Sequence, residues 1–156
     1  MEWSEVIQDP TLRDLPFKIE LNEHGTIMMT PASNRHGRLQ GRIYKRVLDL
    51  ASAGDAMVEC SIDTPKGVKV ADVAWFSDAF LAQHGETTPY PVAPELCVEV
   101  VSPSNSRSEM EEKVQLYLAQ GAKEVWLCSE QGEVEFFVTS GTLDASALFP
   151  AFPARI

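Results

Sequence analysis

The sequence predicts a single α/β domain over residues 1–156, with a central mixed β-sheet flanked by helices and an N-terminal β-hairpin. Several short segments are rich in β-branched residues and bounded by Pro, Gly or Asp, which is typical of strands. Two longer segments repeat apolar residues at helical spacing. The second of them lies between predicted strands, and a strand–helix–strand order requires at least one parallel pair. The length of 156 residues fits one domain better than two, and a 44% hydrophobic content can supply its core.

The first elements are a hairpin and a helix. Residues 17–21 and 26–30 predict two strands joined by a polar turn at 22–25, and Pro31 ends the hairpin. Ser33 or Asn34 can cap a helix that runs to about residue 51, with apolar positions at Leu39, Ile43, Val47 and Leu50. A basic stripe lies beside the apolar one, and it is equally consistent with a solvated face and with nucleic-acid contact. Its members are Arg35, Arg38, Arg42 and Lys45.

The rest of the chain predicts five strands around a second helix. The strands are expected at 56–62, 67–76, 95–101, 124–128 and 133–139, with a loop and a turn of helix at 77–94. The helix is expected to begin after Ser104, Ser106 or Ser108 and to end by Gly121. The ending at 148–156 is consistent with a docking tail or with partial disorder.

Composition excludes several classes of protein. No apolar run is long enough to span a bilayer, and the acidic, polar start is unlike a secretory signal, so a cytoplasmic location is expected. Cys60, Cys97 and Cys128 lie in apolar segments without CxxC spacing, which favours buried free thiols over zinc ligands or disulfides. The net charge of −10 argues against simple electrostatic adsorption to nucleic acid. It leaves room for one basic face or for a carboxylate metal site.

Two carboxylates interrupt apolar strands. Asp72 lies in VKVADVAWF and Glu99 in ELCVEVV. A buried carboxylate needs a partner because desolvation disfavours its charge. For either residue alone, a Lys or Arg partner is the simpler interpretation. Two such residues on consecutive strands would repel each other unless a cation such as Mg²⁺ lay between them.

Lys113 is a candidate cation for the same site. It lies at the edge of the apolar stripe of the second helix, three residues after Met110 and four before Tyr117. Near a carboxylate pair it can stabilise charge on a reacting phosphate. The alternative is a lysine whose stem is packed and whose ammonium reaches water.

These residues carry a resemblance to a known family. The chain from about residue 17 to 138 resembles the bacterial "Uma two" family of restriction-endonuclease-like proteins in the PD-(D/E)XK nuclease superfamily. The segments that carry it are IELNEHGTIMMTPASNRHGRL, VADVAWFS and APELCVEVVSPSNSRSEMEEKVQLYLAQGAKEVWLC. The resemblance implies a restriction-endonuclease-like fold and a hydrolase, most simply a DNA endonuclease, that uses Mg²⁺ or Mn²⁺ and often works as a homodimer.

The resemblance also implies roles for individual residues. Asp72 and Glu99 would bind metal, together with a backbone carbonyl near Val100. Position 71 is Ala where the pattern has Pro, and position 101 is Val where it has Lys. The catalytic lysine is then expected on the following helix, at Lys113.

Three further residues match family positions near this site: Glu20, His36 and Tyr117. Glu20 is equally consistent with a surface partner for a basic residue, and a hydrogen-bonded core histidine is the simpler interpretation of His36. The acidic balance, Ala71 and the missing strand lysine also leave open a different class of protein. That alternative is a catalytically silent module that uses the nuclease fold for binding or dimerisation.

Overall fold

The computed structural model describes all 156 residues and contains a mixed six-stranded sheet with helices on both faces. The strand order is β3-β4-β5-β6-β7-β8, in which β5 and β6 run parallel and every other neighbouring pair is antiparallel. The six strands are β3 (Asp55–Thr64), β4 (Gly67–Phe76), β5 (Leu96–Val100), β6 (Glu124–Cys128), β7 (Val134–Val138) and β8 (Gly141–Leu143). The predicted fold class is therefore confirmed.

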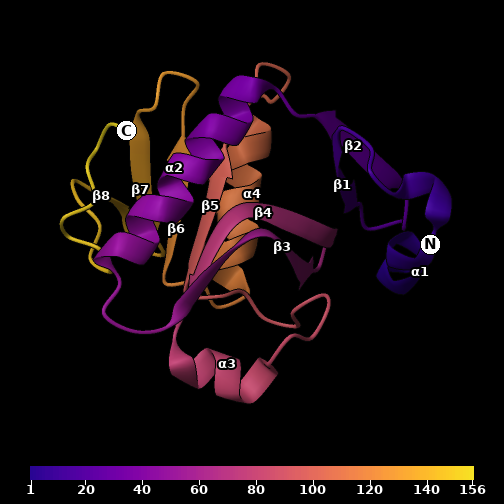
Figure 1. Cartoon of the computed structure of the whole chain (residues 1–156), viewed down its shortest axis with the longest axis horizontal. Coiled ribbons are helices and arrows are strands. Elements are labelled where there is room, and N and C mark those ends of the chain that lie inside the picture. Colours follow the sequence, from indigo (N-terminus) through magenta and orange to yellow (C-terminus); the bar gives the residue numbers. More distant parts are fainter.

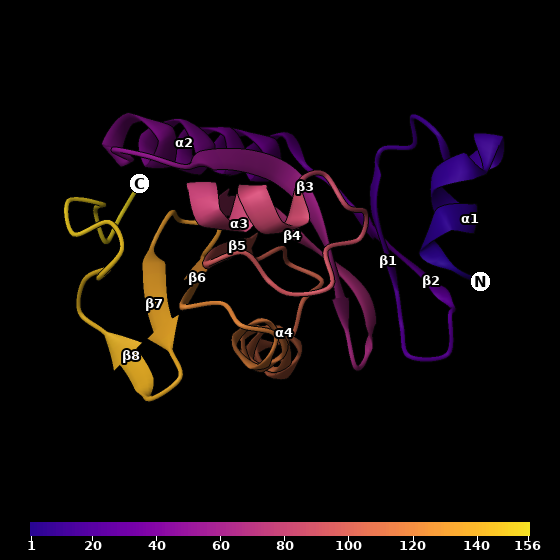
Figure 2. The same ribbon diagram turned by 90° about the horizontal axis from the view of Figure 1, so that it is seen from below.

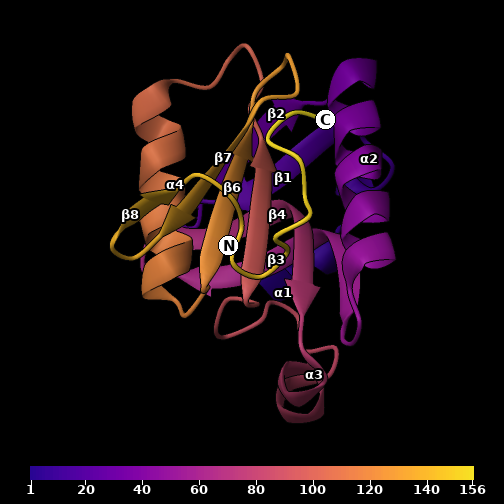
Figure 3. The same cartoon turned by 90° about the vertical axis from the view of Figure 1, so that its left-hand side faces the viewer.

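Two long helices cover the two faces of this sheet. Figure 2 shows α2 (Asn34–Leu50) on one face and α4 (Arg107–Ala119) on the other, and Figure 3 shows the sheet between them. Ser33 caps α2 by accepting a hydrogen bond from the amide of His36. Ser106 caps α4 and forms a capping box with Glu109. The two helices are thus fixed by the capping signals that the sequence carries.

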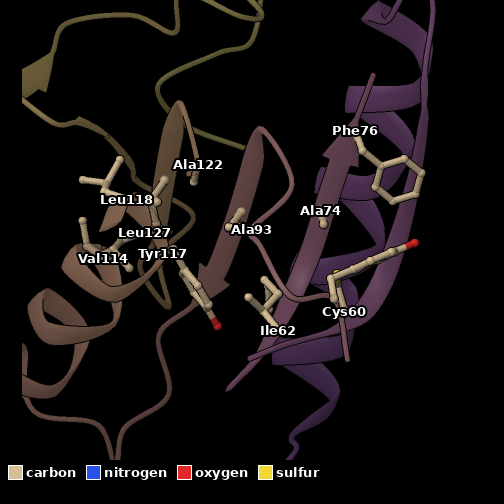
Figure 4. Close-up of a cluster of buried hydrophobic side chains, with 14 of the residues drawn as sticks. Cys60, Ile62, Ala74, Phe76, Ala93, Val114, Tyr117, Leu118, Ala122 and Leu127 are labelled. Atoms are coloured by element: carbon tan, nitrogen blue, oxygen red, sulfur yellow. The ribbon is translucent and has the colours of Figure 1, made fainter. Parts of the chain in front are cut away.

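The helix α4 lies on a cluster of apolar side chains from β3 to β6. Figure 4 shows part of this cluster, with the Tyr117 ring among aliphatic neighbours. On the opposite face, Leu39, Ile43 and Val47 of α2 pack against residues of β4, β5 and β6. All three cysteines are buried and free, as predicted.

A two-stranded hairpin lies beside one end of the main sheet. It consists of β1 (Phe17–Leu21) and β2 (Ile27–Pro31) in antiparallel pairing, and the predicted turn between them is present. Figure 1 shows β4 curving away from β5 toward this hairpin. The sequence did not predict the elements that precede the hairpin, which are α1 (Trp3–Gln8) and a short 3₁₀ helix (Pro10–Leu12). Trp3 and Val6 of α1 are buried against hairpin and β4 side chains, so tertiary packing stabilises this short helix.

The remaining helix, α3 (Asp78–His84), occupies the region where a turn of helix was expected. The C-terminal ending differs from the expectation of a docking tail or partial disorder. Phe149 and Phe152 are buried, and the ring centroids of Phe152 and Trp126 lie 4.4 Å apart. The ending therefore completes the core on the α2 face of the sheet, and β8 precedes it as an edge strand that was not predicted.

Candidate active site

Asp72 and Glu99 face each other where β4 and β5 separate. The last paired residues of these strands are Val73 and Val98, so Asp72 and Glu99 occupy the next position on each strand. The Val100 amide donates a hydrogen bond of 2.7 Å to the Asp72 side chain, at Oδ2. This side-chain oxygen takes the role that a backbone carbonyl has in a regular strand pair. Both side chains are almost fully buried, with exposures of 0% for Asp72 and 2% for Glu99. The structure thus brings together the two carboxylates that interrupt the apolar strands.

A lysine that the sequence analysis did not select lies between these carboxylates. Lys18 Nζ of β1 is 3.2 Å from Asp72 Oδ1 and 2.8 Å from Glu99 Oε2. An ammonium therefore supplies the cation between the two carboxylates, as the simpler interpretation of a Lys or Arg partner expected, and the metal ion stays a prediction. Lys18 and Glu20 are two residues apart and share a face of β1, so both reach the site once the hairpin lies beside β4.

Lys113 reaches the site from α4. Its Nζ is 2.8 Å from Glu20 Oε2 and 3.3 Å from Glu99 Oε1, so its ammonium is paired with two carboxylates inside the site. Glu20 is buried and also accepts a hydrogen bond of 2.7 Å from the Val70 amide. It is a partner for a basic residue, as one alternative proposed, but not at the surface.

Tyr117 and His36 complete the site. The Tyr117 hydroxyl donates a 2.7 Å hydrogen bond to Glu99 Oε1. His36 Nε2 lies 3.1 Å from Asp72 Oδ1, while its buried Nδ1 has no hydrogen-bond partner. His36 is hydrogen-bonded, as the simpler interpretation expected, but its partner is the site carboxylate. Two of the residues matched through the family resemblance thus contact the carboxylate pair, and the third, Glu20, reaches it through Lys113.

Burial and charge shift the titration of these groups in different directions. Burial alone raises the pKa of Asp72, but Lys18 and the hydrogen bond from His36 outweigh it and hold that pKa well below its usual range. Burial raises the pKa of Glu99, and the lysine charges offset this only in part. The pKa of the Lys18 ammonium rises, because the charges of Glu99 and Asp72 outweigh the effect of its burial. The hydrogen bond to Asp72 raises the pKa of His36.

A cleft of about 340 Å³ opens onto this cluster. Its lining comes mainly from the β1–β2 hairpin, the start of β4, the end of β5 and the first turns of α4, and includes Lys18, Glu20, Lys69, Glu99 and Lys113. Burial lowers the pKa of Lys69, which has no carboxylate within ion-pair distance and donates to the Leu21 carbonyl at 3.3 Å. The buried charges are therefore reachable from solvent through a cleft that contains both signs of charge.

The basic stripe of α2 is exposed. Arg35 donates to the Glu130 carbonyl, and Lys45 pairs with Asp49 on the same helix. Arg38 and Arg42 have no carboxylate within ion-pair distance. The stripe is therefore compatible both with a solvated helix face and with a surface that contacts nucleic acid.

The carboxylate oxygens of Asp72 and Glu99 are chemically suitable ligands for a divalent metal. Asp72 Oδ1 and Glu99 Oε2 converge on one cation, the Lys18 ammonium, and carboxylate oxygens are the ligands that Mg²⁺ and Mn²⁺ prefer. No cluster of three or more His, Cys, Asp or Glu side chains is arranged to hold a metal. A metal here would therefore need backbone or water ligands besides these two carboxylates. Val100 contacts the site through its amide, and its carbonyl as a ligand stays a prediction.

The fold and the buried cluster define a protein of the restriction-endonuclease-like class. A family model described as "Uma2: Putative restriction endonuclease" matches residues 9–147, and the chain belongs to this family. Restriction-endonuclease-like proteins generally use divalent metals, and a nucleic acid is the kind of substrate that the family description indicates.

A solved structure shares the fold. It is described as a "putative nuclease belonging to DUF820" from Anabaena variabilis ATCC 29413, and it superposes with a TM-score of 0.71. The identity is 16%, and the match covers 92% of this chain and 83% of that one. No protein with a curated description matches the chain. Among the helices, none has the length and apolar character needed to cross a bilayer.

Proposed function

We propose that this protein is a metal-dependent endonuclease that hydrolyses phosphodiester bonds in nucleic acid, most simply DNA. The observation that carries the proposal is the buried pair Asp72 and Glu99, which share the Lys18 ammonium, with Lys113 Nζ 3.3 Å from Glu99 Oε1. Glu99 and Lys113 also line the cleft. Membership of the family described as "Putative restriction endonuclease" supports the same activity. The proposed unit is a single domain over residues 1–156, acting in the cytoplasm and as a homodimer.

Each residue has a proposed task. Asp72 and Glu99, with the Val100 carbonyl, would hold Mg²⁺ or Mn²⁺, which supplies Lewis acidity toward a phosphate oxygen and activates a water. Lys113 would stabilise the negative charge that develops on the phosphorus oxygens. Tyr117 fixes the orientation of Glu99 through its hydroxyl, and Glu20 positions the Lys113 ammonium. His36 holds Asp72 by a hydrogen bond. The stripe Arg35, Arg38, Arg42 and Lys45 is proposed to contact the backbone of the nucleic acid.

Cleavage of supercoiled plasmid with Mg²⁺ or Mn²⁺ tests the proposal. Asp72→Asn, Glu99→Gln and Lys113→Met should each lower the cleavage rate by about 100-fold or more, the size of effect seen when one charge-stabilising group is removed. Lys123→Met is a matched control, because Lys123 is exposed and makes no ion pair. If purified protein cuts neither DNA nor RNA with either metal, or if the site variants cut as fast as the control, the proposal is wrong.

One observation favours the second candidate, a catalytically silent binding or dimerisation module. Lys18 already pairs with both Asp72 and Glu99, so each carboxylate has a cationic partner without a metal. Binding of Mn²⁺ followed by calorimetry separates the two candidates. A silent module binds no Mn²⁺ that depends on Asp72 and Glu99, whereas the nuclease does.

A further inference from the structure

Lys18 occupies the place where a metal would bind. Its ammonium contacts Asp72 Oδ1 and Glu99 Oε2, the two oxygens that converge on a single point. The Lys18 side chain is only 11% exposed, so this contact is built into the packed site. A divalent ion that uses the same two oxygens cannot share this position with the ammonium.

The charges around the site are nearly balanced without a metal. Two ammonium groups, Lys18 and Lys113, contact three carboxylates, Asp72, Glu99 and Glu20. A divalent ion added while Lys18 stays in place would bring like charges into contact in a buried region where screening is weak. Removal of Lys18 from the carboxylates restores the attraction for the metal.

The cleft beside Lys18 can receive its ammonium once the ammonium leaves the two carboxylates. Its side chain also lines the cleft of about 340 Å³, together with Lys66 and Lys69. Lysine has a flexible four-carbon stem, so rotation about its side-chain bonds can carry the ammonium into this cleft while the β1 backbone stays in place. A phosphate group in the cleft would attract the displaced ammonium.

We propose that Lys18 is an internal competitor of the divalent metal, which holds Asp72 and Glu99 in the metal-free protein and must leave both carboxylates before a metal binds. The proposal rests on the proposed metal-dependent function of the same site. It assigns to Lys18 the control of metal affinity, and it predicts weak metal binding by the protein in the absence of nucleic acid.

Mn²⁺ binding to the full chain, measured by calorimetry without nucleic acid, tests the proposal. Lys18→Met should bind Mn²⁺ at least about tenfold more tightly than the unaltered protein. A change of this size is within the usual range for coupled binding events. Lys18→Arg retains a cation that can bridge the two carboxylates and should bind as weakly as the unaltered protein. Lys69→Met is the matched control, because Lys69 lines the same cleft without a carboxylate partner, and its Mn²⁺ affinity should change little.

The melting temperature gives a second readout. Lys18→Met leaves two buried carboxylates without their shared partner, so its metal-free form should melt below the unaltered protein. Mn²⁺ should raise the melting temperature of Lys18→Met by more than it raises that of the unaltered protein. A purely structural lysine would lower the melting temperature without this recovery.

If Lys18→Met does not fold, the unaltered protein still decides the matter. The lysine ammonium groups can be followed by ¹⁵N NMR, and the Lys18 signal is assigned by its absence in Lys18→Arg. This signal should shift when saturating Mg²⁺ binds Asp72 and Glu99 in place of the ammonium. A Lys18 signal that stays unchanged at saturation overturns the proposal.

The outcomes separate this proposal from the proposed function. Equal Mn²⁺ affinity of Lys18→Met and the unaltered protein, with loss of binding in Asp72→Asn, overturns the role of Lys18 and leaves the nuclease intact. Absence of Mn²⁺ binding in every variant overturns both.

Discussion

The Tyr117 hydroxyl donates a 2.7 Å hydrogen bond to Glu99 Oε1, and both side chains are buried. The pKa of Tyr117 is raised well above its ordinary value by burial and by the neighbouring Glu99 charge, so the hydroxyl keeps its proton and stays a donor at any physiological pH. Tyr117→Phe should lower the free energy of unfolding by about 1–3 kcal/mol, because it removes one hydrogen bond from a buried carboxylate. Urea denaturation measures this loss, and plasmid cleavage should slow in parallel because Glu99 loses its orientation.

A second tyrosine provides the control for that variant. The Tyr90 hydroxyl donates to the Gly85 carbonyl at 2.8 Å, away from the site carboxylates. Tyr90→Phe should lower stability by about 1 kcal/mol, the usual value for a bond between neutral groups, and should leave cleavage unchanged. Equal effects of the two variants on cleavage would show that Tyr117 acts through stability alone.

The ion pair between Lys113 and Glu20 should be coupled energetically. The Nζ to Oε2 distance is 2.8 Å, and the two side chains are 17% and 11% exposed. A double-mutant cycle of Lys113→Met and Glu20→Gln should give a coupling energy of about 1–3 kcal/mol in urea denaturation, since contacting groups in a charged network are not additive. The cycle isolates the pair from the other partners of each residue.

The exposed pair Lys45–Asp49 is the comparison for that cycle, with side-chain exposures of 77% and 55%. Its coupling energy should be about 0.3–0.5 kcal/mol, because water screens an (i, i+4) pair on a helix surface. A Lys113–Glu20 coupling no larger than this would mean that the site is more open to water than the structure indicates.

Strand alternation and helix spacing singled out three of the residues that the structure brings together, whereas Glu20, His36 and Tyr117 came only from the family resemblance. Asp72 and Glu99 stand out because each interrupts an apolar strand, and Lys113 because it lies at the edge of an apolar helix face. The structure places all three together. Lys18 was missed because a lysine on a hairpin strand is normally exposed, and only the docking of the hairpin beside β4 brings its ammonium to the site.

The two ends of the chain were harder to predict, because tertiary contacts fix them. The six residues of α1 are too few to form a stable helix alone, and they depend on the burial of Trp3 and Val6. The ending has two prolines and no periodicity, so nothing in its local sequence shows that Phe149 and Phe152 pack on Trp126. Local patterns predict an element well only where its stability is local or its apolar face is regular.

The buried carboxylate of Glu124 anchors this C-terminal ending. Its Oε1 accepts hydrogen bonds from Trp126 Nε1 at 2.9 Å and Ser146 Oγ at 2.7 Å, and its Oε2 accepts one from the Leu148 amide at 2.7 Å. Glu124→Gln replaces one acceptor oxygen with a donor NH₂ group, so one of these donors loses its partner. The free energy of unfolding should fall by about 1–3 kcal/mol in urea.

Hydrogen exchange at Leu148 should accelerate in Glu124→Gln. Glu133→Gln is the control, because Glu133 is exposed and its side chain makes no ion pair. It should change stability by less than about 0.5 kcal/mol. Unaltered protection of the Leu148 amide in Glu124→Gln would mean that the phenylalanines, and not Glu124, hold the ending in place.

The buried cysteines should make the protein less stable at alkaline pH. Burial raises the pKa of Cys60 to about 12 and that of Cys128 to about 11, from an ordinary value of 9.0. Above pH 9 the unfolded chain loses thiol protons that the folded chain keeps, so the unfolded state is favoured as the pH rises. The free energy of unfolding should therefore fall by up to about 1.4 kcal/mol per pH unit for each such thiol, until the pH reaches the folded pKa.

Cys60→Ala isolates the contribution of one thiol. The variant lacks the titrating group, while the small cavity that it leaves costs the same at every pH. Urea denaturation of both proteins between pH 8 and 10.5 should show a constant difference up to about pH 9. The difference should then shift in favour of Cys60→Ala by about 1 kcal/mol over the next pH unit, because only the unaltered protein gains an unfolded-state thiolate at this position. Parallel curves over the whole range would mean that water reaches Cys60 in the folded state.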